Sequence, residues 1–275
     1  MRKYFHKFFA AIKSVFVYKN FLLFWKNYLD FYKDDYLIIE LRNGVRYKIR
    51  SKKISIADSY IFNETWLYGV HRGIKSIIRE AKIGIDIGAH IGAFSVFAAF
   101  VNPSLKIYAY EPAPDNFKLL KKNINLNKFG NRIIPNEIAI VGDNGKTREL
   151  YLTGKEHGLY TIDRDYLEAI KSYDFHGAVK TIGVKTRTLK DVFSDCGIKF
   201  CAFLKIDCEG AEYEILFNTP PEILRKIKAM SVEYHSGHQV EELKKFLENS
   251  GFLVSFPHRR LDVLLALNEN TLLRA

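Results

Sequence analysis

The chain has 275 residues, 48% hydrophobic and 27% charged, enough to bury a large core and too apolar for a disordered chain. Its three cysteines are odd in number and lack zinc-ligand spacing, which argues against a disulfide framework and favours a reducing, cytoplasmic location. The net charge of +11 is uneven. Residues 1–53 hold thirteen Lys and Arg against four acids, a net +9, which leaves only +2 for the other 222 residues.

Residues 1–33 form a basic and aromatic segment. Its longest uncharged run, residues 20–25, is far shorter than the ~20 residues that span a bilayer. Lys13 interrupts the apolar stretch that a signal peptide would need. We therefore expect neither a transmembrane helix nor a signal peptide in this segment. Two interpretations stay open. The segment is a helix on an anionic membrane surface, or a cap that packs its aromatics on the main domain and leaves its lysines in water.

Residues 36–50 alternate like two strands joined at Asn43-Gly44, a strong hairpin pattern. Residues 55–79 are expected to be helical, with a break near Gly69 and Gly73. We therefore expect an N-terminal extension over residues 1–80 and a main domain over residues 81–275. The extension is expected to close over the cofactor site. Its candidates for pocket lining, or equally for core packing, are Asp58, Tyr60, Glu64, Trp66 and Tyr68.

The apolar run at residues 83–87 predicts a buried parallel strand, followed by a helix from Ala93. Gly88 and Gly92 lie in the turn between them, where missing Cβ atoms would let a ligand approach the backbone. Asp86 would repel a pyrophosphate but suits a ligand with an ammonium group, and S-adenosylmethionine is such a ligand. The turn also lacks the Gly-x-Gly-x-x-Gly spacing of dinucleotide sites, which disfavours a nicotinamide dehydrogenase.

A second strand is expected at residues 106–110, and Glu111 at its end can accept hydrogen bonds from both ribose hydroxyls. A helix follows from Pro114 to Asn127, then a third strand near residues 133–141. Within that strand, a residue near Glu137 to Ala139 is expected to border the adenine, with Ala139 as the candidate and Asp143 as the alternative. His90, inside the glycine turn, is a further candidate for contact with the methionine part of the cofactor.

Further strands are expected at residues 200–206 and 230–233, and residues 252–256 and 262–267 are expected to pair as a terminal hairpin. Strands that alternate with helices predict an α/β fold with a doubly wound, mostly parallel sheet. Such sheets bind ligands beyond the carboxyl ends of the strands on either side of the point where strand order reverses. A polar insertion over residues 143–186 is expected at the same edge, where acceptors meet the site. It carries His157, Tyr160, Asp163, Tyr166 and His176.

Three motifs together resemble the FkbM family of S-adenosylmethionine-dependent methyltransferases. They are Asp86-Ile-Gly-Ala-His-Ile-Gly92, Glu111-Pro112 and Leu204-Lys-Ile-Asp-Cys-Glu-Gly-Ala-Glu212. The resemblance covers roughly residues 80–250, and the last motif is its most specific part. It implies a class I methyltransferase fold with a seven-stranded sheet whose last strand is antiparallel. It also implies O-methylation, often of sugar or polyketide hydroxyls, without fixing the acceptor.

An alcohol acceptor needs a base, and the acidic residues after the fourth and fifth core strands are the candidates. Asp207 and Glu209 are expected to face the acceptor, and Asp207 also borders the cofactor. His235 becomes a competent base if the carboxylate of Glu233 orients its imidazole. No metal site is expected, although Asp207, Glu209 and Glu233 offer the hard oxygen ligands that Mg²⁺ prefers.

The leading interpretation is therefore O-methylation of a hydroxyl on a sugar, a glycan, a lipid-linked molecule or another small acceptor. A nucleic-acid methyltransferase is the first alternative, prompted by the basic N-terminal segment. Acids where a polyanion would dock count against it. So does Asp207-Cys208-Glu209-Gly210, which stands where base methyltransferases carry an Asn/Asp-Pro-Pro-aromatic motif. A non-catalytic adaptor on a membrane surface is the second alternative. The oligomeric state stays open.

Overall fold

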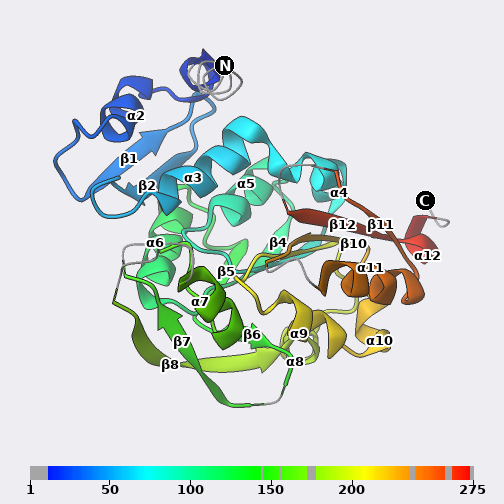
Figure 1. Cartoon of the computed structure of the whole chain (residues 1–275). Coiled ribbons are helices and arrows are strands. Elements are labelled where there is room, and N and C mark those ends of the chain that lie inside the picture. The colour runs from blue at the N-terminus through cyan, green and yellow to red at the C-terminus, as the bar shows by residue number, and fades with distance from the viewer. Residues whose placement is uncertain are drawn as a thin grey trace.

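A seven-stranded sheet forms the centre of the molecule, with the strand order β11-β12-β10-β9-β3-β4-β5 (Figure 1). The computed structural model describes residues 12–143, 145–154, 157–171, 178–235, 239–257 and 262–272. The strands are β3 (Ile83–Ile87), β4 (Lys106–Tyr110), β5 (Ile133–Asn136), β9 (Phe203–Ile206), β10 (Ala229–Glu233), β11 (Phe252–Ser255) and β12 (Val263–Asn268). The neighbours from β5 to β10 pair in parallel, and β12 is antiparallel to β10 and β11. The predicted doubly wound sheet and its terminal hairpin are confirmed.

Helices cover both faces of this sheet, because alternate side chains of each buried strand point to opposite sides. In β4, Ile107 and Ala109 belong to one hydrophobic core, whereas Tyr108 and Tyr110 belong to the other. The first core also contains side chains of α4 (Lys75–Glu80), α5 (Ala93–Val101) and α6 (Pro114–Leu126). The second contains side chains of α8 (Leu189–Asp195), α9 (Glu212–Phe217), α10 (Pro221–Leu224) and α11 (Val240–Asn249). A short α12 (Glu269–Leu272) follows the last strand.

The predicted third strand near residues 133–141 is wrong as a single element. It is divided into β5, at the edge of the central sheet, and β6 (Ala139–Val141), which pairs in parallel with β8 (Lys180–Thr188). Pro135 within β5 lacks the N–H that a strand paired on both sides would need, which suits an edge position. The chain then leaves the central sheet and enters a second one.

This second sheet has three strands in the order β6-β8-β7, and β7 (Thr147–Leu152) is antiparallel to β8. Strands β7 and β8 of this sheet, together with α7 (Arg164–Lys171), correspond to the polar insertion of the sequence (Figure 1). His176 lies outside the described residues.

The N-terminal extension contains the predicted hairpin. Strands β1 (Tyr36–Glu40) and β2 (Arg46–Arg50) pair antiparallel around a turn in which Gly44 has a φ of 88°. Helix α3 (Ala57–Asn63) continues into a π-helical turn, η1 (Glu64–Tyr68). Gly69, with a φ of 66°, then breaks the helix before η2 (Val70–Ile74), as predicted.

Before the hairpin lie a helical stretch over residues 12–17 and α2 (Phe21–Tyr28). Tyr18 and Phe24 of this region are buried in the same hydrophobic core as α5 and α6. Phe16, Leu22 and Phe31 remain 66–74% exposed. Part of the segment therefore packs as a cap, while its other apolar side chains face water. No helix in the described parts of the chain is long and apolar enough to cross a membrane.

Two buried polar contacts attach the hairpin to the main domain. The hydroxyl of Tyr47 donates to the carbonyl oxygen of Ala93 at 3.0 Å. Arg50 is fully buried, pairs with Asp58 at 2.6 Å and donates to the side chain of Asn116 in α6 at 2.7 Å. Separation of the buried Arg50–Asp58 pair would leave an uncompensated charge in the interior, which is costly in free energy. These contacts therefore hold the extension in place.

We predict that Gly88→Ala destabilises the fold by more than about 2 kcal/mol, the usual scale of left-handed strain plus overpacking. Gly88 has a φ of 74°, and a Cβ atom there would lie 1.7 Å from the carbonyl oxygen of Asp207. The control is Gly183→Ala in β8, where a Cβ atom would meet nothing within 4 Å. Urea unfolding of both variants tests this, and equal midpoints would show that the contact does not constrain the turn.

Candidate functional site

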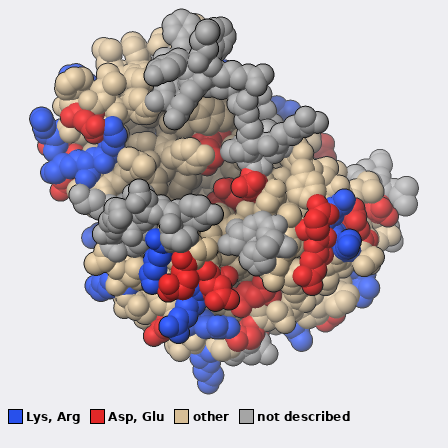
Figure 2. Space-filling model, viewed as in Figure 1, with Lys and Arg blue, Asp and Glu red and all other residues tan. Residues whose placement is uncertain are grey.

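A cavity of about 1090 Å³ opens at the carboxyl ends of β3, β4, β9 and β10. This is the edge at which doubly wound sheets bind ligands. Figure 2 shows the surface hollowed between the region around α2 and the sheet domain, with acidic side chains at the hollow. The predicted site residues that line the cavity are Gly88, His90, Glu111, Ala139, Asp207, Glu209 and His235. Asp86 and Gly92 do not line it.

Lys205 explains why Asp86 lies behind the cavity. Its buried ammonium group donates to the carbonyl oxygen of Gly88 at 2.7 Å and lies 3.3 Å from Asp86 and 3.2 Å from Asp207. Burial alone would lower the pKa of Lys205, but the two carboxylates raise it above its usual value. Burial would likewise raise the pKa of Asp207, but Lys205 holds it below its usual value. The Lys205 contacts therefore hold the ends of β3 and β9 together.

Asp86 itself is fully buried, and its second oxygen accepts a hydrogen bond from Ser95 at 2.6 Å. The structure thus places Asp86 against Lys205 and Ser95, outside the lining of the cavity. Gly92 is also explained by packing, since it has a φ of 86° and a Cβ atom there would meet Leu120 at 2.7 Å. At both turn positions, contacts within the protein leave no room for a Cβ atom, which explains the glycines.

His90 and Glu111 form the part of the cavity between β3 and β4. The backbone N–H of His90 donates to the carboxylate of Glu111 at 2.8 Å, and that of Ala113 donates to its other oxygen at 2.9 Å. Burial raises the pKa of Glu111 to about 7, although these hydrogen bonds oppose the shift. Ile138 and Ala139 line the cavity beyond Glu111 and give it an apolar wall.

The His90 side chain is 7% exposed, and neither ring nitrogen has a hydrogen-bond partner among the described residues. Burial, with Arg50 nearby, lowers its pKa to about 3, so the imidazole is neutral. A buried polar group without a partner is unusual in a folded protein and indicates a place where a ligand supplies the missing hydrogen bond.

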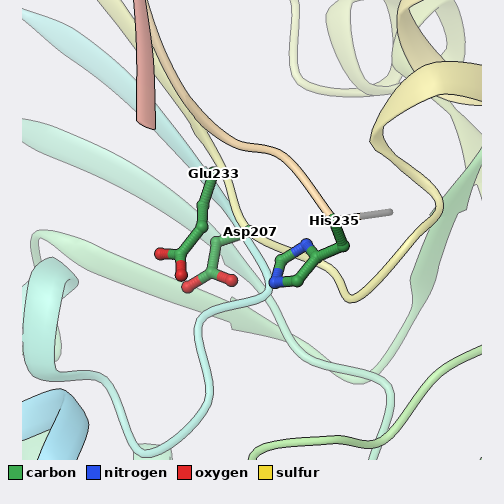
Figure 3. A group of neighbouring side chains, drawn as sticks. All are labelled: Asp207, Glu233 and His235. Atoms are coloured by element: carbon green, nitrogen blue, oxygen red, sulfur yellow. The ribbon is translucent and has the colours of Figure 1, made fainter. Parts of the chain in front are cut away.

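The opposite end of the cavity is acidic. Figure 3 shows the side chains of Asp207, after β9, and of Glu233 and His235, at the end of β10, directed toward one another. Burial and the neighbouring Asp207 raise the pKa of Glu233. The same two causes raise the pKa of Glu64, which reaches the cavity from η1, to about 7. The acids of this end outnumber its cations.

Glu209 and His235 are tied to further residues around this end. The hydroxyl of Tyr166, in α7, donates to Glu209 at 2.6 Å, and Glu209 has a φ of 56°. His235 Nε2 lies 3.4 Å from Glu209, and its Nδ1 lies 3.2 Å from the fully buried Glu212. Burial would lower the pKa of His235, but these carboxylates raise it well above its usual value. Burial raises the pKa of Glu209 to about 7.

The protonated state of His235 has a consequence for its predicted role. An imidazole that already carries both protons cannot accept another, so this arrangement does not suit His235 as a general base. Its expected orienting partner also differs, because Glu212, and not Glu233, lies against its Nδ1.

Comparison with known proteins gives the family. The model of the methyltransferase FkbM domain matches residues 86–254, more than half of the chain. The chain belongs to the FkbM methyltransferase family.

Two relatives and one solved structure illustrate the similarity. The 31-O-demethyl-FK506 methyltransferase FkbM of Streptomyces tacrolimicus is 26% identical over 64% of this chain and 75% of its own. The methyltransferase sdnD of Sordaria araneosa is 27% identical over 61% of this chain and 72% of its own. The crystal structure of methyltransferase FkbM from Methylobacillus flagellatus superposes with a TM-score of 0.44 at 16% identity, over 68% of this chain and 43% of that one.

The family membership makes this chain an S-adenosylmethionine-dependent methyltransferase, and the cavity residues fit that ligand. The carboxylate of Glu111 is a hydrogen-bond acceptor at the end of β4, where ribose hydroxyls are bound in folds of this kind. The neutral ring of His90 has no hydrogen-bond partner among the described residues, although its Nε2 lies 3.7 Å from Asp58, and the wall at Ile138 and Ala139 is apolar. These residues would hold the ligand, which supplies the methyl group.

Asn116, on α6, lines the cavity of the methyltransferase site and was not predicted as a binding residue. Of the insertion residues expected at this edge, His157, Tyr160 and Tyr166 line the cavity, whereas Asp163 does not. Among the candidates in the extension, Tyr60, Glu64 and Tyr68 line it, whereas Asp58 pairs with Arg50 and Trp66 donates to Tyr47. The spacing of apolar residues in Arg164–Lys171 is typical of an amphipathic helix that buries Tyr166. It does not predict that Tyr166 lines the cavity.

We predict that Glu111→Gln weakens S-adenosylmethionine binding at least tenfold, because a neutral amide accepts less strongly than a carboxylate. Below about pH 7 the carboxyl gains a proton and is a poorer acceptor, so wild-type affinity should fall as the pH drops from 8 to 6. Backbone N–H groups, Asn116 and Lys205 oppose this protonation.

Isothermal titration calorimetry at both pH values measures the effect, with Glu222→Gln, a change of an exposed carboxylate on α10, as the matched control. The pH dependence should be flatter in Glu111→Gln. Equal affinity of that variant and wild type would remove Glu111 from ligand recognition.

Proposed function

We propose that this methyltransferase methylates a hydroxyl group on a small-molecule acceptor, either a sugar or glycan or a lipid-linked molecule. The carboxylate of Glu209 carries the proposal, because it stands beside Asp207 at the acidic end of the cavity, away from Glu111. The cavity of about 1090 Å³ exceeds the ~300–1,000 Å³ of a typical pocket for one small ligand. It therefore has room for a donor and an acceptor together.

Methyl transfer to a hydroxyl requires the protein to position the donor and the acceptor and to provide a proton acceptor. The acceptor oxygen bonds to the methyl carbon, and the electron pair of the broken bond remains on sulfur. The hydroxyl proton passes to a carboxylate, and we assign this to Glu209, whose side chain the hydroxyl of Tyr166 holds at 2.6 Å. The Streptomyces relative supports an oxygen acceptor, since its name describes an O-methylation.

The mouth of the cavity supports an acceptor with an apolar part. Five apolar or aromatic side chains that line the cavity are 39–57% exposed. They are Tyr28, Leu29, Ile56, Tyr60 and Tyr68. A phosphate-rich acceptor fits this entrance poorly, because Glu64, Asp207, Glu209 and Glu233 lie behind it. The same acids argue against nucleic acid as the substrate.

The test of this function uses S-adenosylmethionine with an isotope-labelled methyl group and a panel of free sugars, lipid-linked sugars and apolar alcohols. We expect mass spectrometry to find the label on an acceptor oxygen, and Glu209→Gln to lower turnover by roughly 100-fold or more while S-adenosylmethionine affinity is kept. Glu222→Gln is the control for turnover. Label on nitrogen, or full activity of Glu209→Gln, would contradict the proposal.

We also propose that residues 1–33 touch a membrane surface from the cytoplasmic side. Phe16, Leu22 and Phe31 are exposed on this segment, among exposed lysines at positions 13, 19, 26 and 33. Apolar side chains with basic neighbours suit an anionic bilayer surface.

Sedimentation with phosphatidylserine vesicles tests this contact. The double variant Phe16→Ser/Leu22→Ser should release the protein, whereas Leu253→Ser, which changes an equally apolar side chain 52% exposed on β11, should not. Equal sedimentation of all three proteins would exclude membrane contact through these side chains.

A further inference from the structure

We propose that Asp207, Glu233 and His235 bind a divalent metal ion at the acidic end of the cavity. One ligand atom from each residue lies within 4.8 Å of the other two (Figure 3). The three residues come from the ends of the adjacent parallel strands β9 and β10, so the central sheet positions them. All three line the large cavity, where an ion can meet an acceptor.

The donor set indicates the kind of metal. Two carboxylates and one imidazole make a mixed oxygen and nitrogen set, which suits Mn²⁺ or Zn²⁺ better than Mg²⁺, an ion that prefers oxygen alone. The sequence had offered Asp207, Glu209 and Glu233 as Mg²⁺ ligands. The structure brings His235, and not Glu209, into the group with Asp207 and Glu233.

Buried neighbours hold His235 in a suitable orientation. The fully buried carboxylate of Glu212 lies 3.2 Å from Nδ1 and accepts the backbone N–H of His235 at 2.5 Å. Nε2 is therefore the nitrogen available to an ion, which would replace the proton that this nitrogen carries in the absence of metal. A carboxylate behind a histidine is the usual support of histidine ligands at metal sites. Glu209, 3.4 Å from Nε2, would have to give way to the ion or join its ligands.

The charge at this place indicates a cation. Lys205 pairs with Asp207, but Glu233 has no hydrogen bond or ion pair among the described residues, although it faces Asp207. A divalent ion between these two carboxylates would supply the missing partner of Glu233. Five or six coordination positions around such an ion leave room beyond three protein ligands.

The role of the ion rests on the proposed function, although its binding does not. A divalent ion at this position would bind the acceptor hydroxyl and make it more acidic. Glu209 would then take the proton, and the oxygen would form its bond to the methyl carbon.

The test is a titration of the full chain, stripped of metal with EDTA and desalted, with Mn²⁺ alone. Electron paramagnetic resonance measures the free ion. We expect saturable binding of one Mn²⁺ per chain, displaced by Zn²⁺ more readily than by Mg²⁺. Glu233→Gln keeps the shape of the side chain and should raise the dissociation constant at least tenfold. His235→Gln should do the same, and Glu222→Gln should leave it unchanged.

No saturable binding by the wild type would overturn the site whatever the variants do. Binding that is equal in wild type, Glu233→Gln and His235→Gln would also overturn it, because the ion would then sit elsewhere. Circular dichroism confirms that each variant is folded. Calorimetry with S-adenosylmethionine runs in parallel. If S-adenosylmethionine binds and Mn²⁺ does not, only the metal site is contradicted. If Mn²⁺ binds and S-adenosylmethionine does not, the donor assignment is contradicted and the metal site is unaffected.

Discussion

The contacts of the buried Lys205 ammonium group connect the two halves of the sheet at the point where strand order reverses. It bonds to Gly88 at the end of β3 and pairs with Asp86 and Asp207 on either side. Loss of one member of such a buried pair typically costs ~3–5 kcal/mol, because the remaining charge has no water to replace it. The contact explains why Gly88 cannot carry a Cβ atom, since the backbone of Asp207 is drawn against it. It also fixes the carboxylate of Asp207 in the lining of the cavity.

From this contact the cavity divides into two environments with different chemistry. Around His90 and Glu111 the groups are neutral or bonded to backbone N–H groups, which suits a ligand held by many weak, directional contacts. At the acidic end, burial and the neighbouring Asp207 carboxylate raise the pKa of Glu209 and of Glu233, so these groups favour a proton or a cation nearby. A methyl donor and a hydroxyl acceptor need these different surroundings, because the first is positioned and the second must lose a proton. Asp207 belongs to both environments.

Sequence patterns predicted what depends on short-range order. The runs at residues 83–87 and 106–110, with Gly88 and Glu111 at their ends, gave the strands and the residues of the cavity edge, because strand ends meet at one edge of a parallel sheet. They did not predict that Asp86 points into the core, because that depends on Lys205, more than a hundred residues away. The division of residues 133–141 between two sheets and the pairing of His235 with Glu212 likewise depend on contacts distant in sequence.

The extension over residues 1–80 supplies one wall of the cavity and is connected to the donor end through Asn116. Arg50 donates to the side-chain oxygen of Asn116 at 2.7 Å. The side-chain nitrogen of Asn116 lies 3.5 Å from the carboxylate of Glu111. Asp58 pairs with Arg50 and lies in α3, which continues into η1, where Glu64 lines the cavity. A π-helical turn at this position is typical of functional sites, since the extra residue redirects the side chains that follow. Changes in the extension that displace Arg50 would therefore also change the hydrogen bonding of Glu111 through Asn116. The wall that the extension contributes and the carboxylate of Glu111 are thus connected by hydrogen bonds through Arg50 and Asn116.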